Sequence, residues 1–213
     1  RWISQHRPDI VHMHSFTRGC GYFHAQYTKN LGIPLVITIH AADFLCVGGT
    51  SMRWGEIPCD GRINAIRCTS CWVKKCGMPW FIAWVLARIP LWASSFARHV
   101  ENKIGTAFSV HRLFLEREKQ IQSIFRFSDH IIAVSKWLYY ALHLNGVPHE
   151  KITLCRHGLP SEFMPGFLEK PQRRVSDVLR LGFLGRFNSV KGLHVLVKAV
   201  RGLPLSCKIE LRI

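Results

Sequence analysis

The run Leu35-Val-Ile-Thr-Ile-His40 constrains the fold more than any other stretch of this 213-residue sequence. It is rich in β-branched residues and is almost entirely apolar until it reaches His40. A continuous apolar run of this length is typical of a parallel strand that is covered on both faces. The run therefore predicts a buried parallel strand with a histidine at its carboxyl end.

Strand-like and helix-like patterns alternate along the rest of the chain. Short apolar runs predict further strands at residues 9–14, 129–135, 151–155, 179–184 and 206–213. Periodic patterns predict helices at residues 21–31, 136–144 and 191–200, and a longer helical stretch from residue 78 to about residue 127 that Pro90 interrupts. Residues 41–77 are read as an irregular, Cys-containing insert. Because strands that alternate with helices form parallel sheets, we expect an α/β fold with Rossmann-like sheets and helices on both faces.

A stretch rich in proline, glycine and charge, residues 161–177, separates these elements into two groups and is typical of an interdomain linker. We expect an N-terminal domain at residues 1–160, with its insert at 41–77, and an incomplete second domain at 178–213. The chain begins at Arg1, and its last strand-like run reaches Ile213. We therefore expect a fragment of a longer protein.

The charge of the chain is strongly positive. Lysine and arginine number 29 against 13 acidic residues, a formal net charge of +16, which attracts polyanions such as nucleic acid, anionic lipid or phosphorylated ligands. The basic residues are scattered, and the chain has no RNA-recognition, helix-turn-helix or zinc-finger pattern. We therefore do not expect a nucleic-acid partner.

The carboxyl ends of the predicted strands select the candidate site residues, because ligands of open α/β sheets bind there. Two histidines, His12 and His14, share one face of the first strand, for which we favour structural or pocket-lining roles because no third metal ligand is evident. The residues that end the strands are His14, His40, Ser135, Gly158, and the pair Gly185 and Arg186.

The stretch from Gly185 to Lys191 has the chemistry of a phosphate site. Arg186 offers a planar fork of donors, Lys191 offers a point charge near a predicted helix start, and Gly185 is expected to let the backbone turn sharply. From spacing alone, a solvated basic turn explains these residues equally well.

Five motifs, in this order along the chain, resemble the retaining glycosyltransferase family 4: RPDIVHMHS, GIPLVITIHAADFLC, SDHIIAVSKWL, NGVPHEKITLCRHGL and LRLGFLGRFNSVKGLHVLVKAV. The resemblance spans nearly the whole chain. It implies the GT-B fold, in which two Rossmann-like domains face each other across a cleft. It also implies transfer of a sugar from a nucleotide-sugar donor to a glycan or lipid-linked acceptor, such as a growing polysaccharide, with retention at the anomeric carbon.

Through this resemblance, Gly185, Arg186 and Lys191 correspond to the segment that binds the donor diphosphate. His40 corresponds to the family histidine near the donor sugar, where it would act in catalysis without a required cofactor. Without the resemblance, a strand-end residue bonded to backbone is the favoured interpretation of His40. His157 stands where the family commonly has asparagine, and the family's glycine-rich loop and acidic Glu-x7-Glu region are not in this sequence. We therefore expect the fragment to be inactive by itself.

Cysteines cluster in the insert. The spacing Cys46-x12-Cys59-x8-Cys68-x2-Cys71 supplies four soft ligands with one CxxC pair, which suits a structural zinc ion. Disulfides and free thiols are the alternatives. Any zinc here would fold the insert and take no part in catalysis.

The helical stretch after the insert is rich in tryptophan, isoleucine and leucine. Arg88 and Pro90 lie in its middle, so we favour an interfacial or buried helix over a membrane span. With the basic charge, this predicts a cytoplasmic protein held peripherally on the inner face of an anionic membrane. The main alternative to the enzyme is a non-catalytic GT-B-like module that binds an acidic partner.

Overall fold

The computed structural model describes residues 2–16, 19–90, 92, 103–158, 176–187, 191–204 and 206–213. They divide into two compact units, Arg1–His157 and Gly158–Ile213. The predicted linker at 161–177 lies almost wholly outside the described residues. The assignment of the two units to an acceptor-side and a donor-side domain stays a prediction.

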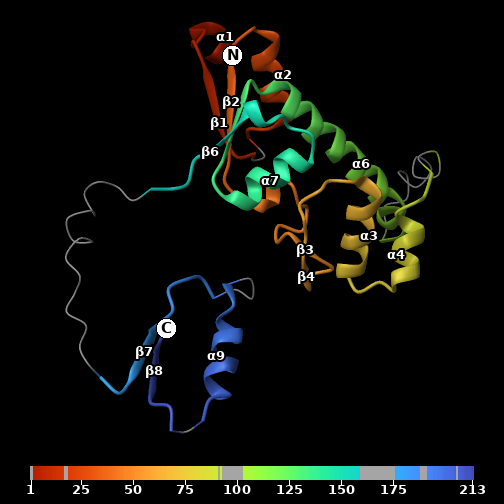
Figure 1. Cartoon of the computed structure of the whole chain (residues 1–213). Coiled ribbons are helices and arrows are strands. Elements are labelled where there is room, and N and C mark those ends of the chain that lie inside the picture. Colours follow the sequence, from red (N-terminus) through yellow and green to blue (C-terminus); the bar gives the residue numbers. More distant parts are fainter. Residues whose placement is uncertain are drawn as a thin grey trace. The chain divides into compact units, whose positions relative to one another are not determined.

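The first unit is built on a four-stranded parallel sheet in the order β1-β2-β5-β6 (Figure 1). Its strands are β1 (Val11–His14), β2 (Leu35–Ile39), β5 (His130–Ala133) and β6 (Ile152–Leu154). The helices of this unit are α1 (Trp2–His6), α2 (Tyr22–Asn30), η1 (Ala42–Phe44), α3 (Ala65–Lys75), α4 (Trp80–Leu86), α6 (Lys103–Phe127), α7 (Lys136–Leu144) and η3 (His149–Lys151). The prediction of an α/β chain with a parallel sheet is therefore confirmed.

One face of this sheet is the core of the unit. Alternate residues of β2 (Leu35, Ile37 and Ile39) are buried with Ile131 of β5 in a single cluster. Helices α2, α6 and α7 all contribute buried side chains to that same cluster, so they pack on the same face.

The other face of the sheet carries polar side chains. His12 Nε2 lies 2.8 Å from Thr38 Oγ1, and His130 Nε2 lies 2.8 Å from Thr153 Oγ1. Because side chains alternate across a strand, these residues face away from the apolar cluster. The expected cover of helices on both faces is therefore not seen in the described part of the chain.

One carboxylate, that of Asp129, holds together the amino-terminal edge of the sheet. Asp129 Oδ2 accepts a hydrogen bond from the Leu35 backbone N–H at 2.9 Å, and Lys29 Nζ lies 2.8 Å from Asp129 Oδ1. Burial raises the pKa of Asp129, but the bonds from Lys29 and Leu35 outweigh it and hold the pKa below its usual value. The carboxylate therefore ties α2 to the start of both β2 and β5.

The insert is more regular than the sequence predicts. It contains a short antiparallel pair, β3 (Met52–Arg53) and β4 (Ile57–Pro58), and the complete helix α3. Asn64 caps α3, since its side chain accepts a hydrogen bond from the Arg67 backbone N–H. The reading of residues 41–77 as irregular was wrong for α3, whose pattern is short and whose stabilising contacts come from α4 and α6.

Asn145, at the end of α7, holds the insert against the core. Its buried Nδ2 donates to the carbonyls of Gly61 and Ala141, and its Oδ1 accepts from the Ile63 backbone N–H at 2.7 Å. Gly61 has φ +82°, and a Cβ there would lie 2.7 Å from Ala141 Cβ. The insert thus approaches α7 more closely than any residue but glycine permits.

In its described residues, the second unit contains β7 (Leu179–Gly182), α9 (Leu193–Arg201) and β8 (Ile209–Arg212). The two strands pair in parallel, with Leu179 opposite Ile209. None of the residues in these three elements is fully buried.

None of the helices described here is both long and apolar enough to cross a membrane.

We expect Asn145→Ala to lower the free energy of unfolding by at least about 2 kcal/mol, because it leaves buried backbone groups of Gly61 and Ile63 without partners. Chemical denaturation of the purified chain measures this change. Asn30→Ala, at an exposed asparagine ending α2, is the matched control and should change stability by less than about 0.5 kcal/mol. Equal effects of the two substitutions would contradict the role given to Asn145.

Candidate functional site

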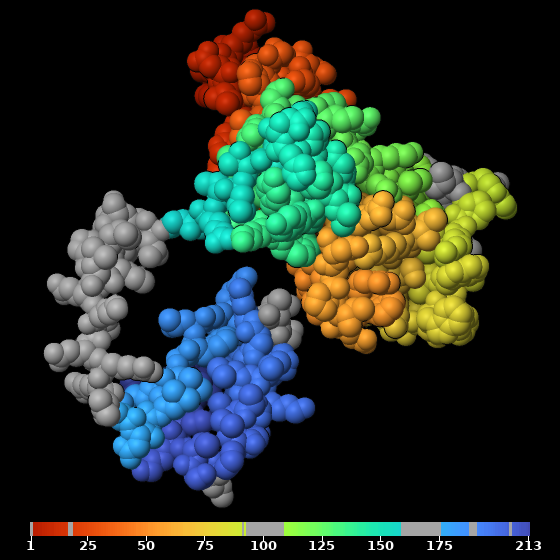
Figure 2. Space-filling view, viewed as in Figure 1, coloured from red at the N-terminus to blue at the C-terminus, as the bar shows by residue number. Residues whose placement is uncertain are grey.

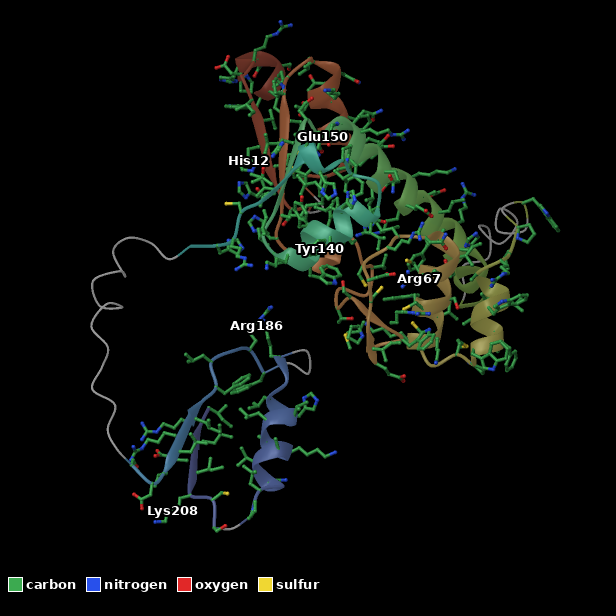
Figure 3. The ribbon with its side chains drawn as sticks, viewed as in Figure 1. His12, Arg67, Tyr140, Glu150, Arg186 and Lys208 are labelled. Carbon is green, nitrogen blue, oxygen red and sulfur yellow. The ribbon has the colours of Figure 1, made fainter. Side chains whose placement is uncertain are left out.

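Four histidines form a row that reaches the carboxyl edge of the parallel sheet. His12 and His14 come from β1, His40 directly follows β2, and His157 follows β6. His12 pairs opposite Val36 within the strands, where Figure 3 labels it, and the pairing of His14 with Thr38 places His40 just beyond the end of the same ladder. The row therefore ends where open parallel sheets bind their ligands.

The rings of the row are in contact with one another. His14 Nδ1 lies 2.9 Å from His40 Nε2, a hydrogen-bond distance. The ring centroids of His12 and His14 are 4.2 Å apart, and those of His40 and His157 are 5.4 Å apart with planes tilted by only 5°. The predicted pair His14 and His40 is thus joined directly, and the row continues on both sides of it.

The backbone at the end of β1 is strained. Ser15 has φ +59°, in the left-handed region that non-glycine residues rarely adopt. Its N–H donates to the Thr38 carbonyl at 3.0 Å, which extends the β1–β2 ladder by one bond. Strain of this kind persists where surrounding contacts over-determine it, and it is frequent beside functional groups.

The environment of the row opposes positive charge. Burial lowers the pKa of His12, and the neighbouring rings of His14 and His40 lower it further when they are charged. The hydrogen bond between His14 and His40 requires one ring N–H and one bare ring nitrogen. Neutral imidazoles of this kind can donate to and accept from the hydroxyl or phosphate groups of a ligand.

The other two predicted residues at these strand ends have different surroundings. Ser135 caps α7, since its Oγ accepts a hydrogen bond from the Leu138 N–H at 3.2 Å. Gly158 has open space around the position that a Cβ would occupy. Ser135 therefore has a structural role that accounts for its presence, and Gly158 makes no close approach that demands a glycine.

The predicted phosphate segment belongs to the second unit. Arg186 extends from the loop after β7, away from the strands and helix of its own unit (Figure 3). Lys191 is exposed and precedes α9, whose N-cap is Gly192. Within the described residues, neither cation has a hydrogen bond or an ion pair, so both are available to an anion.

Two glycines of this segment have different backbone conformations. The chain bends at Gly185, as the sequence predicts, but without a left-handed φ, and a Cβ there would lie 3.3 Å from the Phe183 ring. Gly192, beside Lys191 at the start of α9, has φ +75°. The left-handed backbone that favours glycine is therefore at Gly192.

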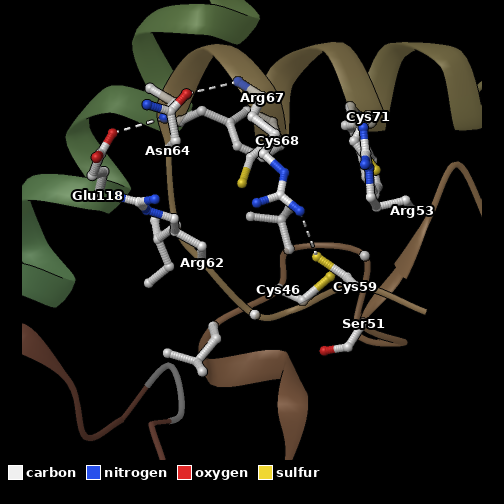
Figure 4. Close-up of a pocket in the computed structure, with 18 of the residues that line it drawn as sticks. Cys46, Ser51, Arg53, Cys59, Arg62, Asn64, Arg67, Cys68, Cys71 and Glu118 are labelled. Carbon is white, nitrogen blue, oxygen red and sulfur yellow. Dashed lines mark hydrogen bonds between the residues drawn. The ribbon is translucent and has the colours of Figure 1, made fainter. Parts of the chain in front are cut away.

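The four clustered cysteines line one cavity in the insert (Figure 4). Cys46 follows η1, Cys59 follows β4, and Cys68 and Cys71 lie one turn apart on α3. All four are free thiols. The grouping that the spacing predicts is therefore present as a shared cavity.

The surroundings of two of these thiols raise their pKa. Burial is the main cause at Cys68; a hydrogen bond with the Asn64 backbone lowers the pKa of that thiol, and the nearby thiols of Cys59, Cys46 and Cys71 raise it. Burial also raises the pKa of Cys59, although a hydrogen bond with the Gly61 backbone and the charge of Arg67 partly offset it. Both thiols are therefore harder to ionise than a thiol in water.

Sequence reasoning missed the role of His157 in the row. It noted His157 only as a departure from the Asn-Gly pattern, and it treated His12 as a partner of His14 alone. The signal was available in principle, because His157 also follows a strand end. Its ring reaches His40 only because the chain after β6 crosses the end of β5, which no local pattern indicates.

Comparison of the chain with protein-family models, with curated proteins and with solved structures found no match in any of the three.

The row predicts a specific pH dependence of stability. Because the pKa of His12 is lower in the folded chain than the ordinary 6.5, its contribution is complete above pH 6.5 and is lost as the pH falls through the folded-state pKa. Wild type should therefore lose more stability between about pH 7.5 and about pH 5.5 than His12→Gln does. Denaturant titrations at the two pH values measure the difference.

His194→Gln, at an exposed histidine of α9, is the matched control and should show the wild-type pH dependence. If His12→Gln loses as much stability between the two pH values as wild type does, protonation of His12 is not the cause of that loss.

Proposed function

We propose that this chain belongs to a glycosyltransferase of the GT-B type. It would transfer a sugar from a nucleotide-sugar donor to a glycan or lipid-linked acceptor, with retention of configuration. The observation that carries the proposal is the contact between His14 and His40 at the carboxyl edge of a parallel sheet. The five sequence motifs that resemble glycosyltransferase family 4 support it independently.

In this proposal, the histidine row binds the sugar. His40 hydrogen-bonds a donor-sugar hydroxyl and, with its ring held by His14, supports the oxocarbenium-like centre as the glycosidic bond breaks. His157 stacks on the other side of His40 and limits the directions in which that ring can turn. The strained turn at Ser15 fixes the position of His14.

Arg186 and Lys191 would stabilise the leaving nucleoside diphosphate. Both are exposed cations without partners in the described part of their unit, and the N-terminal amides of α9 begin beside Lys191. A guanidinium, an ammonium and a helix start together suit a diphosphate. Fixed cations of this kind perform the charge stabilisation that a divalent metal would otherwise supply, so no catalytic cofactor is required.

We expect Arg186→Ala, Lys191→Ala and His40→Ala each to lower kcat of the full-length protein by about 10²-fold or more, as loss of a single transition-state contact typically does. Release of nucleoside diphosphate from nucleotide-sugar donors measures turnover. Lys198→Ala, at a lysine in the last turn of α9, is the matched control and should keep wild-type turnover.

Two results would contradict the proposal. If the full-length protein turns over no nucleotide sugar but binds acidic polymers, the non-catalytic binding module is favoured. Turnover that is indifferent to Arg186 and Lys191 would remove the diphosphate role of that segment.

We also propose that α4 rests on an anionic membrane surface. Helix α4 exposes Trp80, Phe81, Trp84 and Val85, each by half or more of its surface. Figure 2 shows the insert and α4, coloured orange to yellow, as a lobe that projects from the rest of the first unit. The sequence has no acidic residue from position 61 to position 100, while Lys74, Lys75 and Arg88 lie beside the aromatic residues. Exposed tryptophans with basic neighbours are typical of interfacial helices.

Flotation with phosphatidylserine-containing vesicles should recover the protein, and vesicles of phosphatidylcholine alone should recover much less. The double substitution Trp80→Ser and Trp84→Ser should weaken binding about tenfold or more, since each buried tryptophan contributes apolar area. Trp2→Ser, at an exposed tryptophan outside α4, is the control. Equal binding to both vesicle types, or no effect of the double substitution, would exclude this surface.

A further inference from the structure

We propose that Cys46, Cys59, Cys68 and Cys71 form a structural zinc site that holds the insert in its fold. The four thiols come from three separate segments and line one cavity of about 60 Å³. That volume exceeds what a single water molecule requires, so the cavity can accept an ion at its centre. The site is distinct from the histidine row and from the donor segment.

The composition of the cavity selects the metal. Four cysteine sulfurs are soft ligands that favour zinc over magnesium or calcium, which take oxygen ligands. Cys68 and Cys71 are three residues apart on α3, so their side chains emerge from one face of that helix. Four protein ligands leave no open coordination position, so the ion would serve structure and not catalysis.

Two of the four sulfur atoms already accept a hydrogen bond from an N–H group. The Trp54 backbone N–H donates to Cys71 Sγ at 3.2 Å, and Arg67 Nη2 lies 3.7 Å from Cys59 Sγ (Figure 4). Hydrogen bonds to ligating sulfur orient the ligand and stabilise the thiolate form. Arg67 is in turn held by Asp60 at 2.8 Å, so the Cys59 side of the cavity has a fixed cation.

The insert has few buried residues to stabilise its fold, so a bound metal ion would contribute to its stability. Between Cys46 and Asp60 no residue is fully buried, and the only strands there, β3 and β4, are two residues each. The two residues that flank β3, Ser51 (φ +49°) and Trp54 (φ +60°), are both in the left-handed region. A segment with so little core and two strained residues is the kind that proteins stabilise with a metal or a disulfide.

The four cysteine side chains must rotate before their sulfur atoms can bind one zinc ion. No group of three or more His, Cys, Asp or Glu side chains among the described residues is arranged to hold a metal ion as it stands. Cysteine has a single side-chain torsion, and a change between its staggered wells moves Sγ by about 3 Å. All four cysteines line the same cavity, and on this proposal rotation of their side chains brings the sulfurs together around the ion.

Metal analysis of the purified full chain, in reducing buffer and with any affinity tag removed, tests the proposal. We expect one zinc ion per chain, and loss of that zinc in Cys59→Ser and in Cys68→Ser. Cys76→Ser is the matched control, since Cys76 lies just after α3 but does not line the cavity, and it should retain the zinc.

A second measurement covers variants that fail to fold. X-ray absorption of the wild-type protein should show four sulfur neighbours at about 2.3 Å from zinc. Substoichiometric zinc in folded wild type, zinc retained in Cys59→Ser and Cys68→Ser, a shell without sulfur, or disulfides among the four cysteines in the native mass would each overturn the proposal. It does not depend on the proposed function, because zinc content and turnover are measured separately.

Discussion

The burial of β2 between β1 and β5 is the constraint on which the first unit depends. Leu35, Ile37 and Ile39 are excluded from water on one face, so the strand has one register that keeps all three inside. The parallel pairing that follows brings His14 and His40 to the same edge of the sheet. Asp129 secures the opposite edge by bonding both Lys29 and the Leu35 N–H. The positions of the histidines are therefore a consequence of the burial of these apolar residues, which lie one to five positions before His40.

The insert is held in place by α6 and α7, two helices that also contribute side chains to this core. Helix α6 contributes Ile121, Ile124 and Phe125 to the core, and its Glu118 accepts a hydrogen bond from the Ala65 N–H at the start of α3. Helix α7 reaches the insert through Asn145 and through Trp137, whose Nε1 donates to the Cys59 carbonyl. Two of the helices that cover the sheet, α6 and α7, therefore support the insert that carries the cysteine cavity. This explains how an irregular segment acquires a defined position.

Much of this architecture was predictable from sequence. The six parallel strands, the helices α2, α7 and α9, and the break in the long helical stretch at Pro90 follow from apolar runs, periodicity and glycine or proline punctuation. Helix α3 was missed because its eleven residues are stabilised by contacts with α4 and α6. The bend at Gly185 was expected, but the left-handed backbone at Gly192 was not, because sequence alone does not say which glycine adopts it.

The sequence by itself determined the parallel α/β class, the histidines at two strand ends and the four cysteines of the insert, because each is a local pattern of residue type and spacing. Only the tertiary structure decided that His157 stacks on His40, that the helices share one face of the sheet, and that the four thiols surround one cavity. These features join residues that are far apart in the chain, such as Cys46 and Cys59, which are 13 positions apart, and His40 and His157, which are 117 positions apart. Contacts over such intervals are set by how packed elements meet, and local sequence carries no direct signal of that.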